Sequence, residues 1–154
     1  MNLFGYSEEL GHYFLAPAVL HAHFRHLKPM MELVIPHTAK CYDYGTAMPN
    51  FGKDRIRTPE QAFAYKAQVL EIAHQYNPHF DLNVPFYIDP DTDPDVVIEG
   101  FKSGAWIAGK LYSKDATTGS EFGIDFRKLD KLAPLFDAME EHGIILLGHF
   151  DAIH

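Results

Sequence analysis

The sequence has little of what marks a secreted, membrane or nucleic-acid-binding protein. It holds a single cysteine, Cys41, which excludes an internal disulfide and fits a reducing compartment. No apolar run approaches the roughly 18 residues that a membrane span needs, and the first residues lack the basic start and apolar core of a signal peptide. Lys and Arg form no cluster and the formal net charge is -8, so nucleic acid and anionic membranes are poor partners. We therefore expect a cytoplasmic protein.

What is present is the composition of a soluble globular chain, with 47% hydrophobic and 22% charged residues. A length of 154 residues suits one domain and is short for two, so we expect a single domain over residues 1–154. No internal repeat or low-complexity tract is visible. The unusual feature of the composition is ten histidines. Because histidine is the commonest metal ligand, metal binding is a candidate function.

Short apolar runs alternate with helical segments, and this order predicts an α/β fold with a parallel sheet. The predicted strands are Val19–Arg25, Tyr44–Pro49, Leu82–Ile88, Ala105–Tyr112 and Ile144–Phe150. Residues 1–18 have no clean period and are expected to be a lead-in that covers one end of the fold.

The clearest predicted helix follows Arg57. Thr58 is an N-cap, Pro59 suits the first helical position, and Gln61 completes a capping box. The expected buried stripe consists of Ala62, Tyr65, Val69, Ile72 and Tyr76. Asn77-Pro78 ends this helix.

The other helices have weaker signals. Within Lys28–Lys40 any helix is expected to be short, because this segment contains two prolines. Asp93-Pro94 predicts the start of another helix, with Gly104 as its C-terminal cap. Ser113–Gly123 is a polar loop, and a last helix, delayed or kinked by Pro134, runs to His142 and is closed by Gly143.

Two histidines lie in the first predicted strand. Alternation puts Val19, His21, His23 and Arg25 on one face and Leu20, Ala22 and Phe24 on the other, apolar face. A pair of imidazoles on one face can bind one metal ion from two sides. The alternative is a strand end whose histidines face water.

Two further candidate side chains lie near the C-terminal ends of predicted strands. Lys110 lies in an otherwise apolar run, so either it reaches solvent at the strand end or chemistry removes its charge. His149 has the same relative place on the fifth strand. Asn50 follows the second strand, and Thr117 and Thr118 follow the fourth. The C-terminal ends of parallel strands share one rim, where α/β folds carry their sites.

The segments that carry these residues resemble the dihydroorotases of the amidohydrolase superfamily, over roughly residues 19–154. They include His21–Arg25, Ala47–Asn50, Glu60–Lys66, Glu99–Gly104, Lys110–Ser120 and Leu146–His149, in the order and at about the spacing of that family. The Lys-Leu-Tyr…Ala-Thr-Thr stretch is the most specific of them.

The resemblance implies a zinc hydrolase that reversibly opens L-dihydroorotate to N-carbamoyl-L-aspartate in pyrimidine biosynthesis. Two zinc ions would be held by His21, His23, a carbamylated Lys110 and His149. Arg25 and Asn50 would bind the substrate carboxylate, and Thr117 and Thr118 would lie on a mobile loop over the small-molecule substrate.

The sequence also departs from the family. His26 and Leu27 stand where the family has Asp-Gly, Ser113 replaces a proline, and Phe150-Asp151 replace Gly-Glu. Three further strands, with a zinc-binding histidine and the general-base aspartate, have no counterpart, so the catalytic base is unknown. We expect a partial TIM-type (β/α) barrel of about five parallel strands, and we expect the isolated chain to be inactive. The unpaired edges of its first and fifth strands would favour self-association into a homo-oligomer.

Two alternative functions remain open. One is a non-catalytic remnant or binding module, folded as an open α/β sheet. The other is an amidohydrolase that acts on a different cyclic amide.

Overall fold

The computed structural model describes residues 4–7, 11–15 and 17–150, and for residues 12–15 and those before Gly11 it describes the backbone alone. Its elements in order are β1 Phe4–Ser7, β2 His12–Leu15, β3 Ala18–Ala22, α1 Lys28–Cys41, β4 Tyr44–Ala47, the 3₁₀ turn η1 Gly52–Asp54, α2 Pro59–Ala73, β5 Asp81–Asn83, β6 Phe86–Ile88, α3 Pro94–Lys102, β7 Ala108–Tyr112, the 3₁₀ segment η2 Phe126–Leu132, α4 Ala133–His142 and β8 Ile145–His149.

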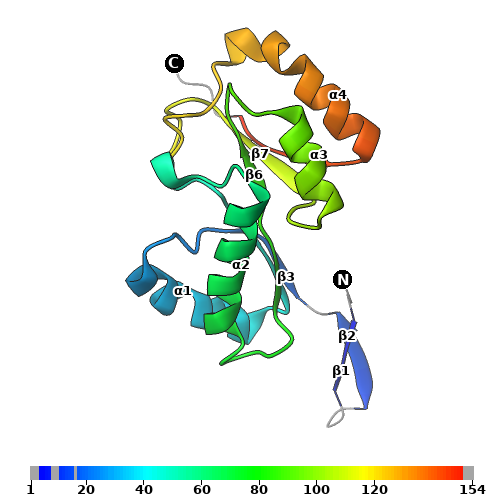
Figure 1. Cartoon of the computed structure of the whole chain (residues 1–154). Helices are drawn as coiled ribbons and strands as arrows, with labels where there is room; N and C mark the ends of the chain where they lie inside the picture. Colours follow the sequence, from blue (N-terminus) through cyan, green and yellow to red (C-terminus); the bar gives the residue numbers. More distant parts are fainter. Residues whose placement is uncertain (1–3, 8–10, 16, 151–154) are drawn as a thin grey trace. The chain divides into compact units, whose positions relative to one another are not determined.

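Two parallel three-stranded sheets form the fold (Figure 1). In the first, β3 pairs with β4 and β4 with β5; in the second, β6 pairs with β7 and β7 with β8. The expected α/β class with parallel pairing is therefore confirmed.

The chain divides into two compact units. Unit 1 comprises residues 1–47 and 67–83 and contains the first sheet, and unit 2 comprises residues 48–66 and 84–154 and contains the second. Phe24, Ile35 and Phe80 are fully buried in the core of unit 1. Tyr87, Trp106 and Tyr112 are the largest buried side chains of unit 2.

The predicted third strand is divided in two. Instead of one strand over Leu82–Ile88, β5 ends at Asn83 and β6 begins at Phe86. Pro85 lies in the gap, and proline has no N–H to donate to a ladder. One predicted strand therefore contributes to both sheets.

The α2 helix begins as its sequence predicts. The Thr58 hydroxyl accepts a hydrogen bond from the Gln61 N–H at 3.4 Å, and the Gln61 side chain accepts one from the Thr58 N–H at 3.1 Å, which is a capping box. Ala62, Tyr65 and Val69 are buried as expected. The stripe ends earlier than predicted, because the helix stops at Ala73 and Tyr76 is 45% exposed.

The α1 helix corrects a prediction, because it runs for 14 residues instead of being short. Pro29 lies in the first turn, where its missing N–H has no helical partner to lose. Pro36 lies inside the helix and costs one backbone hydrogen bond. The neighbouring side chains Ile35 and Ala39 are fully buried, and this packing offsets that cost.

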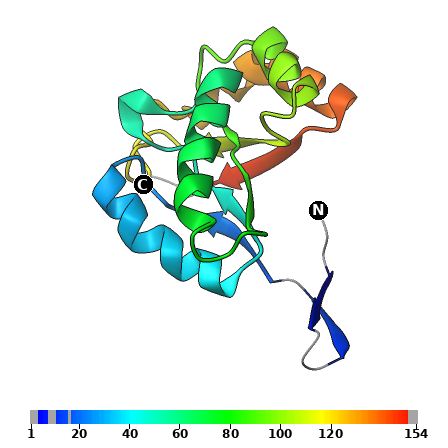
Figure 2. The same cartoon turned by 60° about the horizontal axis from the view of Figure 1, so that its bottom comes forward.

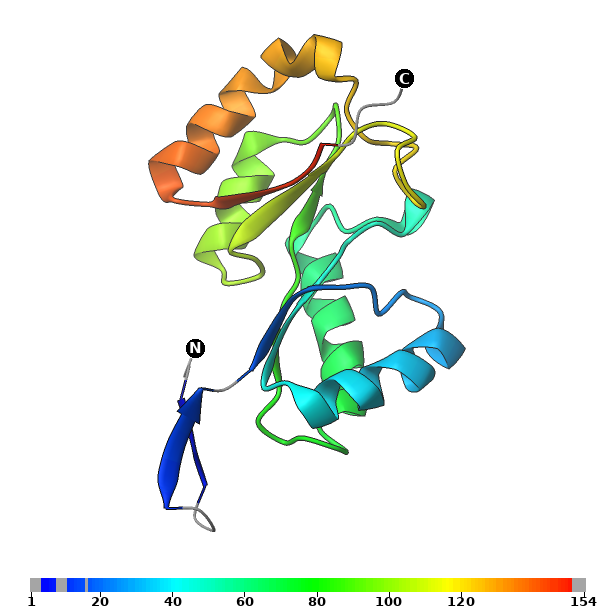
Figure 3. The ribbon, with the colours of Figure 1, turned by 180° about the vertical axis from the view of Figure 1, so that it is seen from behind.

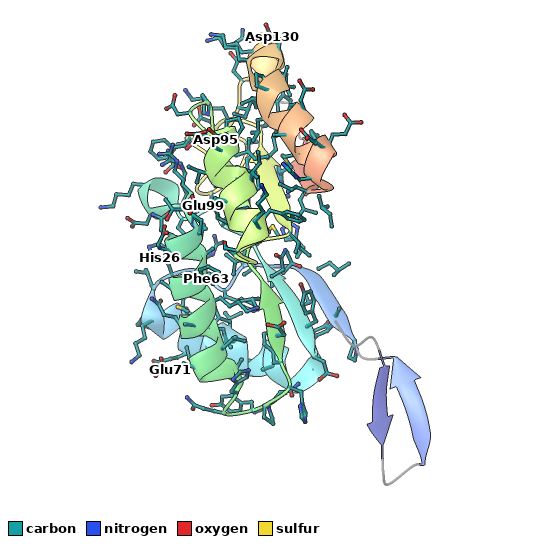
Figure 4. The ribbon with its side chains drawn as sticks, turned by 45° about the vertical axis from the view of Figure 1, so that its right-hand side comes forward. His26, Phe63, Glu71, Asp95, Glu99 and Asp130 are labelled. Atoms are coloured by element: carbon teal, nitrogen blue, oxygen red, sulfur yellow. The ribbon has the colours of Figure 1, made fainter. Side chains whose placement is uncertain are left out.

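In unit 2, α3 and α4 pack side by side next to the β6–β8 sheet (Figure 3). The α3 helix starts at its predicted cap, where the Asp93 carboxylate accepts a hydrogen bond from the Asp95 N–H at 2.9 Å. Asp95 and Glu99 face solvent on this helix (Figure 4), and Val97 on its other side is buried. As predicted, α4 starts late, with Pro134 in its first turn, and it ends at Gly143 in a left-handed conformation.

Near the N-terminus, β1 and β2 pair as an antiparallel hairpin (Figure 2). The sequence of residues 1–18 did not predict this element. In the part of the chain that the structure describes, no helix is long and apolar enough to cross a membrane.

Candidate active site

The two histidines of the first strand come together in unit 1. The Nε2 atoms of His21 and His23 lie 3.1 Å apart, and the ring centroids are 5.0 Å apart. Two nitrogens bound to one zinc ion at about 2.0–2.1 Å lie roughly 3 Å apart, so this spacing suits a shared ion. His21 is exposed and His23 is half-buried, with its Nδ1 atom inside the protein.

The first strand is shorter than predicted and does not reach Arg25. It ends at Ala22, and Arg25 has a left-handed backbone with φ +64°. This conformation breaks the two-residue alternation, because the chain turns here toward α1. The expected apolar face also differs, since Phe24 is fully buried but Leu20 is 66% exposed.

Lys110 is buried in unit 2, at 3% exposure, in the middle of β7. The alternative in which this lysine reaches solvent is therefore wrong. Its Nζ donates one hydrogen bond, to the Gly148 carbonyl at 3.3 Å, and lies 5.1 Å from the centroid of the Tyr112 ring. Burial lowers the pKa of Lys110, because the apolar surroundings disfavour the ammonium form.

His149 ends β8, as predicted, and is half-buried. It is in register with Tyr112, and Lys110 is in register with Leu147. Register partners in a parallel ladder share a face, so Lys110 and His149 project from the same face of the sheet, one row apart.

Asn50 and the loop after β7 are in contact. The Asn50 side-chain amide donates to the backbone carbonyl of Thr118 at 2.7 Å, and Asn50 is 3% exposed. Thr117 accepts from the Ser120 hydroxyl at 2.6 Å, which holds the loop in a tight turn. The expected proximity of the second and fourth strand ends is confirmed for these residues.

A cluster that the sequence did not predict lies at the end of β6. Asp89 is 1% exposed and pairs with Arg55 at 2.7 Å and with Arg57 at 3.0 Å. Tyr87, two residues earlier, has a buried hydroxyl, and desolvation raises its pKa despite the opposing charge of Arg55. The position of Asp89 directly after the third predicted strand was the signal that could have identified this cluster.

A cleft of about 1030 Å³ opens beside this cluster in unit 2. Its walls come from Arg55 and from residues 89–91, 113–115, 121–128, 131 and 132. Among the described residues that line it, none is a predicted site residue, so the cleft and the predicted metal ligands are separate features.

The predicted site residues are divided between the two units. His21, His23 and Arg25 belong to unit 1, and Asn50, Lys110, Thr117, Thr118 and His149 belong to unit 2. Among the residues that the structure describes, no three His, Cys, Asp or Glu side chains form one metal-binding group. Asp151, the acid nearest to the predicted ligands in sequence, lies outside the described residues.

Solved structures share this arrangement of strands and helices. A dihydroorotase from Saccharomyces cerevisiae, in complex with 5-fluoroorotic acid, superposes with a TM-score of 0.78 and 27% identity over 90% of this chain. The chain is similar to dihydroorotases. A dihydroorotase from Campylobacter jejuni gives a TM-score of 0.79 and 25% identity over 89% of this chain. No family model matches the sequence.

The similarity to dihydroorotases confirms the resemblance expected from the sequence motifs and indicates a fold related to the TIM barrel. The chain spans 37% of the length of the yeast dihydroorotase and 38% of the C. jejuni enzyme. This coverage fits the expected resemblance to an N-terminal part of these proteins.

Proposed function

We propose that the chain is part of a dihydroorotase-like zinc hydrolase, whose reaction is the reversible ring opening of L-dihydroorotate to N-carbamoyl-L-aspartate. The observation that carries this proposal is Lys110. It is buried, and its one hydrogen bond among the described residues goes to a backbone carbonyl. Burying an ammonium group that makes a single hydrogen bond costs folding free energy. Carbamylation converts the amine to an anionic group whose oxygens can bind a metal ion.

The proposed zinc ligands are His21, His23, carbamylated Lys110 and His149. The first two fit one ion because their Nε2 atoms are 3.1 Å apart. Lys110 and His149 fit neighbouring positions because they share a sheet face. Bound zinc supplies a Lewis acid that makes water acidic enough to attack an amide near neutral pH.

Arg25 and Asn50 are the proposed partners of the substrate carboxylate. A guanidinium can give a carboxylate two parallel hydrogen bonds. Asn50 already donates one amide hydrogen to Thr118, so its second amide hydrogen is the one left for substrate. Thr117 and Thr118 would then cover the substrate from the loop that Asn50 holds.

The fold belongs to the same proposal. We infer a single domain over residues 1–154 in which five parallel strands form part of a (β/α) barrel. The similarity to dihydroorotase structures supports this reading, with TM-scores of 0.78 and 0.79 over about 90% of this chain. A cytoplasmic location is also proposed, on the single cysteine.

The test measures zinc and carbamate directly on the purified chain. Zinc titration by calorimetry should show binding, and ¹³C-bicarbonate with zinc should give a carbamate carbon signal in the NMR spectrum. His23→Ala should lose zinc binding, and Lys110→Arg should lose the carbamate signal.

Matched controls come from the same units. His79→Ala changes an exposed histidine of unit 1 and should leave zinc binding intact. Lys114→Arg changes an exposed lysine four residues from Lys110 and should keep the carbamate signal. Zinc binding that survives His23→Ala, or a carbamate that never forms, would instead favour a non-catalytic binding module.

A further inference from the structure

Two contacts besides the one at Asn50 join the loop after β7 to the segment after β4. The Glu121 carboxylate lies beside Gly52, and its Oε1 atom is 2.7 Å from the position that a methyl group on Gly52 would take. The Phe122 ring covers the Arg55 guanidinium, whose central carbon lies 3.9 Å from the ring centroid. A guanidinium stacked on an aromatic face at this distance makes a cation–π contact. The loop therefore meets this segment at three points.

Arg55 is fixed from behind by β6 and the residue that follows it. Its Nε and Nη2 atoms donate to Oδ2 of Asp89 at 2.9 and 2.7 Å, and Asp89 is 1% exposed. The other Asp89 oxygen accepts from the Asp91 N–H at 3.0 Å, so both ends of the carboxylate are bonded. The backbone is held as well, since the Tyr87 N–H donates to the Ile56 carbonyl at 2.7 Å. The guanidinium therefore presents a fixed surface to the loop.

The edge and the face of the Arg55 guanidinium make different contacts. Asp89 accepts from N–H groups at the edge, while Phe122 stacks on one face. A lysine could pair with the carboxylate, but it has no flat face to offer the ring. Phe122 is 36% exposed, so the contact with Arg55, and not burial in the core, sets the position of this ring.

A short hydrogen-bonded turn connects Phe122 to the two threonines of the loop. The Thr117 N–H donates to the Ser120 hydroxyl at 2.9 Å, and the Ser120 N–H donates to the Thr117 carbonyl at 3.1 Å. Ser120 is fully buried, which leaves this turn little freedom. A displacement of Phe122 therefore moves Thr117 and Thr118 with it.

We propose that Arg55 is a positioning residue for the hydrolysis proposed above. Asp89 holds Arg55, and Arg55 fixes the ring of Phe122. Through the turn, this contact keeps Thr117 and Thr118 in the position from which they cover the substrate. The loop is then already docked before the substrate binds, so that binding does not have to order it. This inference rests on the proposed function, in which the two threonines cover the substrate.

The experiment is ¹⁵N relaxation on the full chain without zinc, bicarbonate or substrate. In the parent, the Thr117 and Thr118 amides should have the order parameters of a rigid backbone, about 0.85. Phe122→Leu removes the ring but keeps an apolar side chain, and it should lower these values below about 0.6. Phe122→Tyr keeps the ring and should retain the parent values. Phe63→Leu, at a phenylalanine of α2 that is 45% exposed, is the matched control and should behave like the parent.

A further variant tests whether Arg55 and Phe122 act through one contact. Arg55→Lys keeps a positive charge beside Asp89 but should lower the same order parameters. Combining it with Phe122→Leu should add no further mobility, because both changes remove the same contact. Mobile threonines in the parent, rigid threonines in Phe122→Leu, or equal mobility in Phe122→Leu and Phe122→Tyr would overturn the proposal. Since this measurement involves no zinc or carbamate, its outcome is separate from that of the zinc and carbamate tests.

Discussion

At the scale of single residues, Lys110 shows how burial and charge conflict. Its exposed fraction is 3%, and burial lowers its pKa from the ordinary value of a lysine. The folded state therefore binds fewer protons than the unfolded state between the lowered pKa and about 10.4. The stability of the parent protein must rise with pH through that window.

Lys110→Met should consequently stabilise the protein by about 1–2 kcal/mol at pH 7 in buffer free of zinc and bicarbonate, since methionine fills similar space without a charge. The advantage should shrink as pH rises through the lowered pKa of Lys110, because the parent lysine then loses its charge in the folded state. Urea unfolding at pH 7 and pH 10 measures both values. A variant less stable than the parent at pH 7 would contradict this account.

At the scale of elements, the loop after β7 is held against the segment after β4 by a close backbone contact. Gly119 has φ +75°, and a methyl group added there would lie 2.5 Å from the Asn50 carbonyl oxygen. Gly119→Ala should therefore combine backbone strain with a steric clash and destabilise the protein by at least about 2 kcal/mol. Amide hydrogen exchange over residues 113–123 should become faster. Urea unfolding measures the loss in the free energy of unfolding.

Gly104 provides a matched control for this effect. Its φ is +77°, nearly that of Gly119, but nothing lies within 4 Å of an added methyl group. Gly104→Ala should cost about 1 kcal/mol from backbone strain alone and leave the loop unchanged. Equal losses in the free energy of unfolding for Gly119→Ala and Gly104→Ala would mean that the close contact with Asn50 has no effect on stability.

Elements with strong local signals were predictable from the sequence, and those decided by distant packing were not. The capping box at Thr58 acts within one turn, so its residues suffice to place the start of α2. Pro36 suggested a short helix, but the burial of Ile35 and Ala39 outweighs one lost hydrogen bond. The division at Pro85 was missed, because an apolar run does not tell which neighbouring strand each part pairs with.

The residues of the candidate site were also predictable from the sequence only in part. The spacing of His21 and His23 predicted that they lie together, and their Nε2 atoms are 3.1 Å apart although β3 ends at Ala22. Lys110 and His149 were identified by their places near the C-terminal ends of predicted strands; His149 ends β8, but Lys110 lies in the middle of β7. Arg25 does not follow the alternation of side chains along a strand, because its backbone leaves the extended region. Asp89 was missed because its partners Arg55 and Arg57 are more than 30 positions away in sequence.

At the scale of the whole molecule, we expect the purified chain to show no turnover of dihydroorotate. A hydrolase of this kind needs a base that takes and returns a proton, and the resemblance assigns that role to an aspartate that matches no residue here. The assay follows dihydroorotate consumption with zinc and bicarbonate present. Robust turnover by residues 1–154 would show that another acid, such as Asp151, serves as the base.

The α2 helix belongs to both units, because the division between them falls after Lys66, inside Pro59–Ala73. This has a consequence for synthesis on the ribosome, where a chain emerges from its N-terminus. The β3 and β4 strands emerge early, but β5, the third strand of their sheet, emerges only after α2. The first strand of the other sheet then emerges within two residues of β5. The first sheet of the nascent protein must therefore stay incomplete until all of α2 and then β5 have emerged.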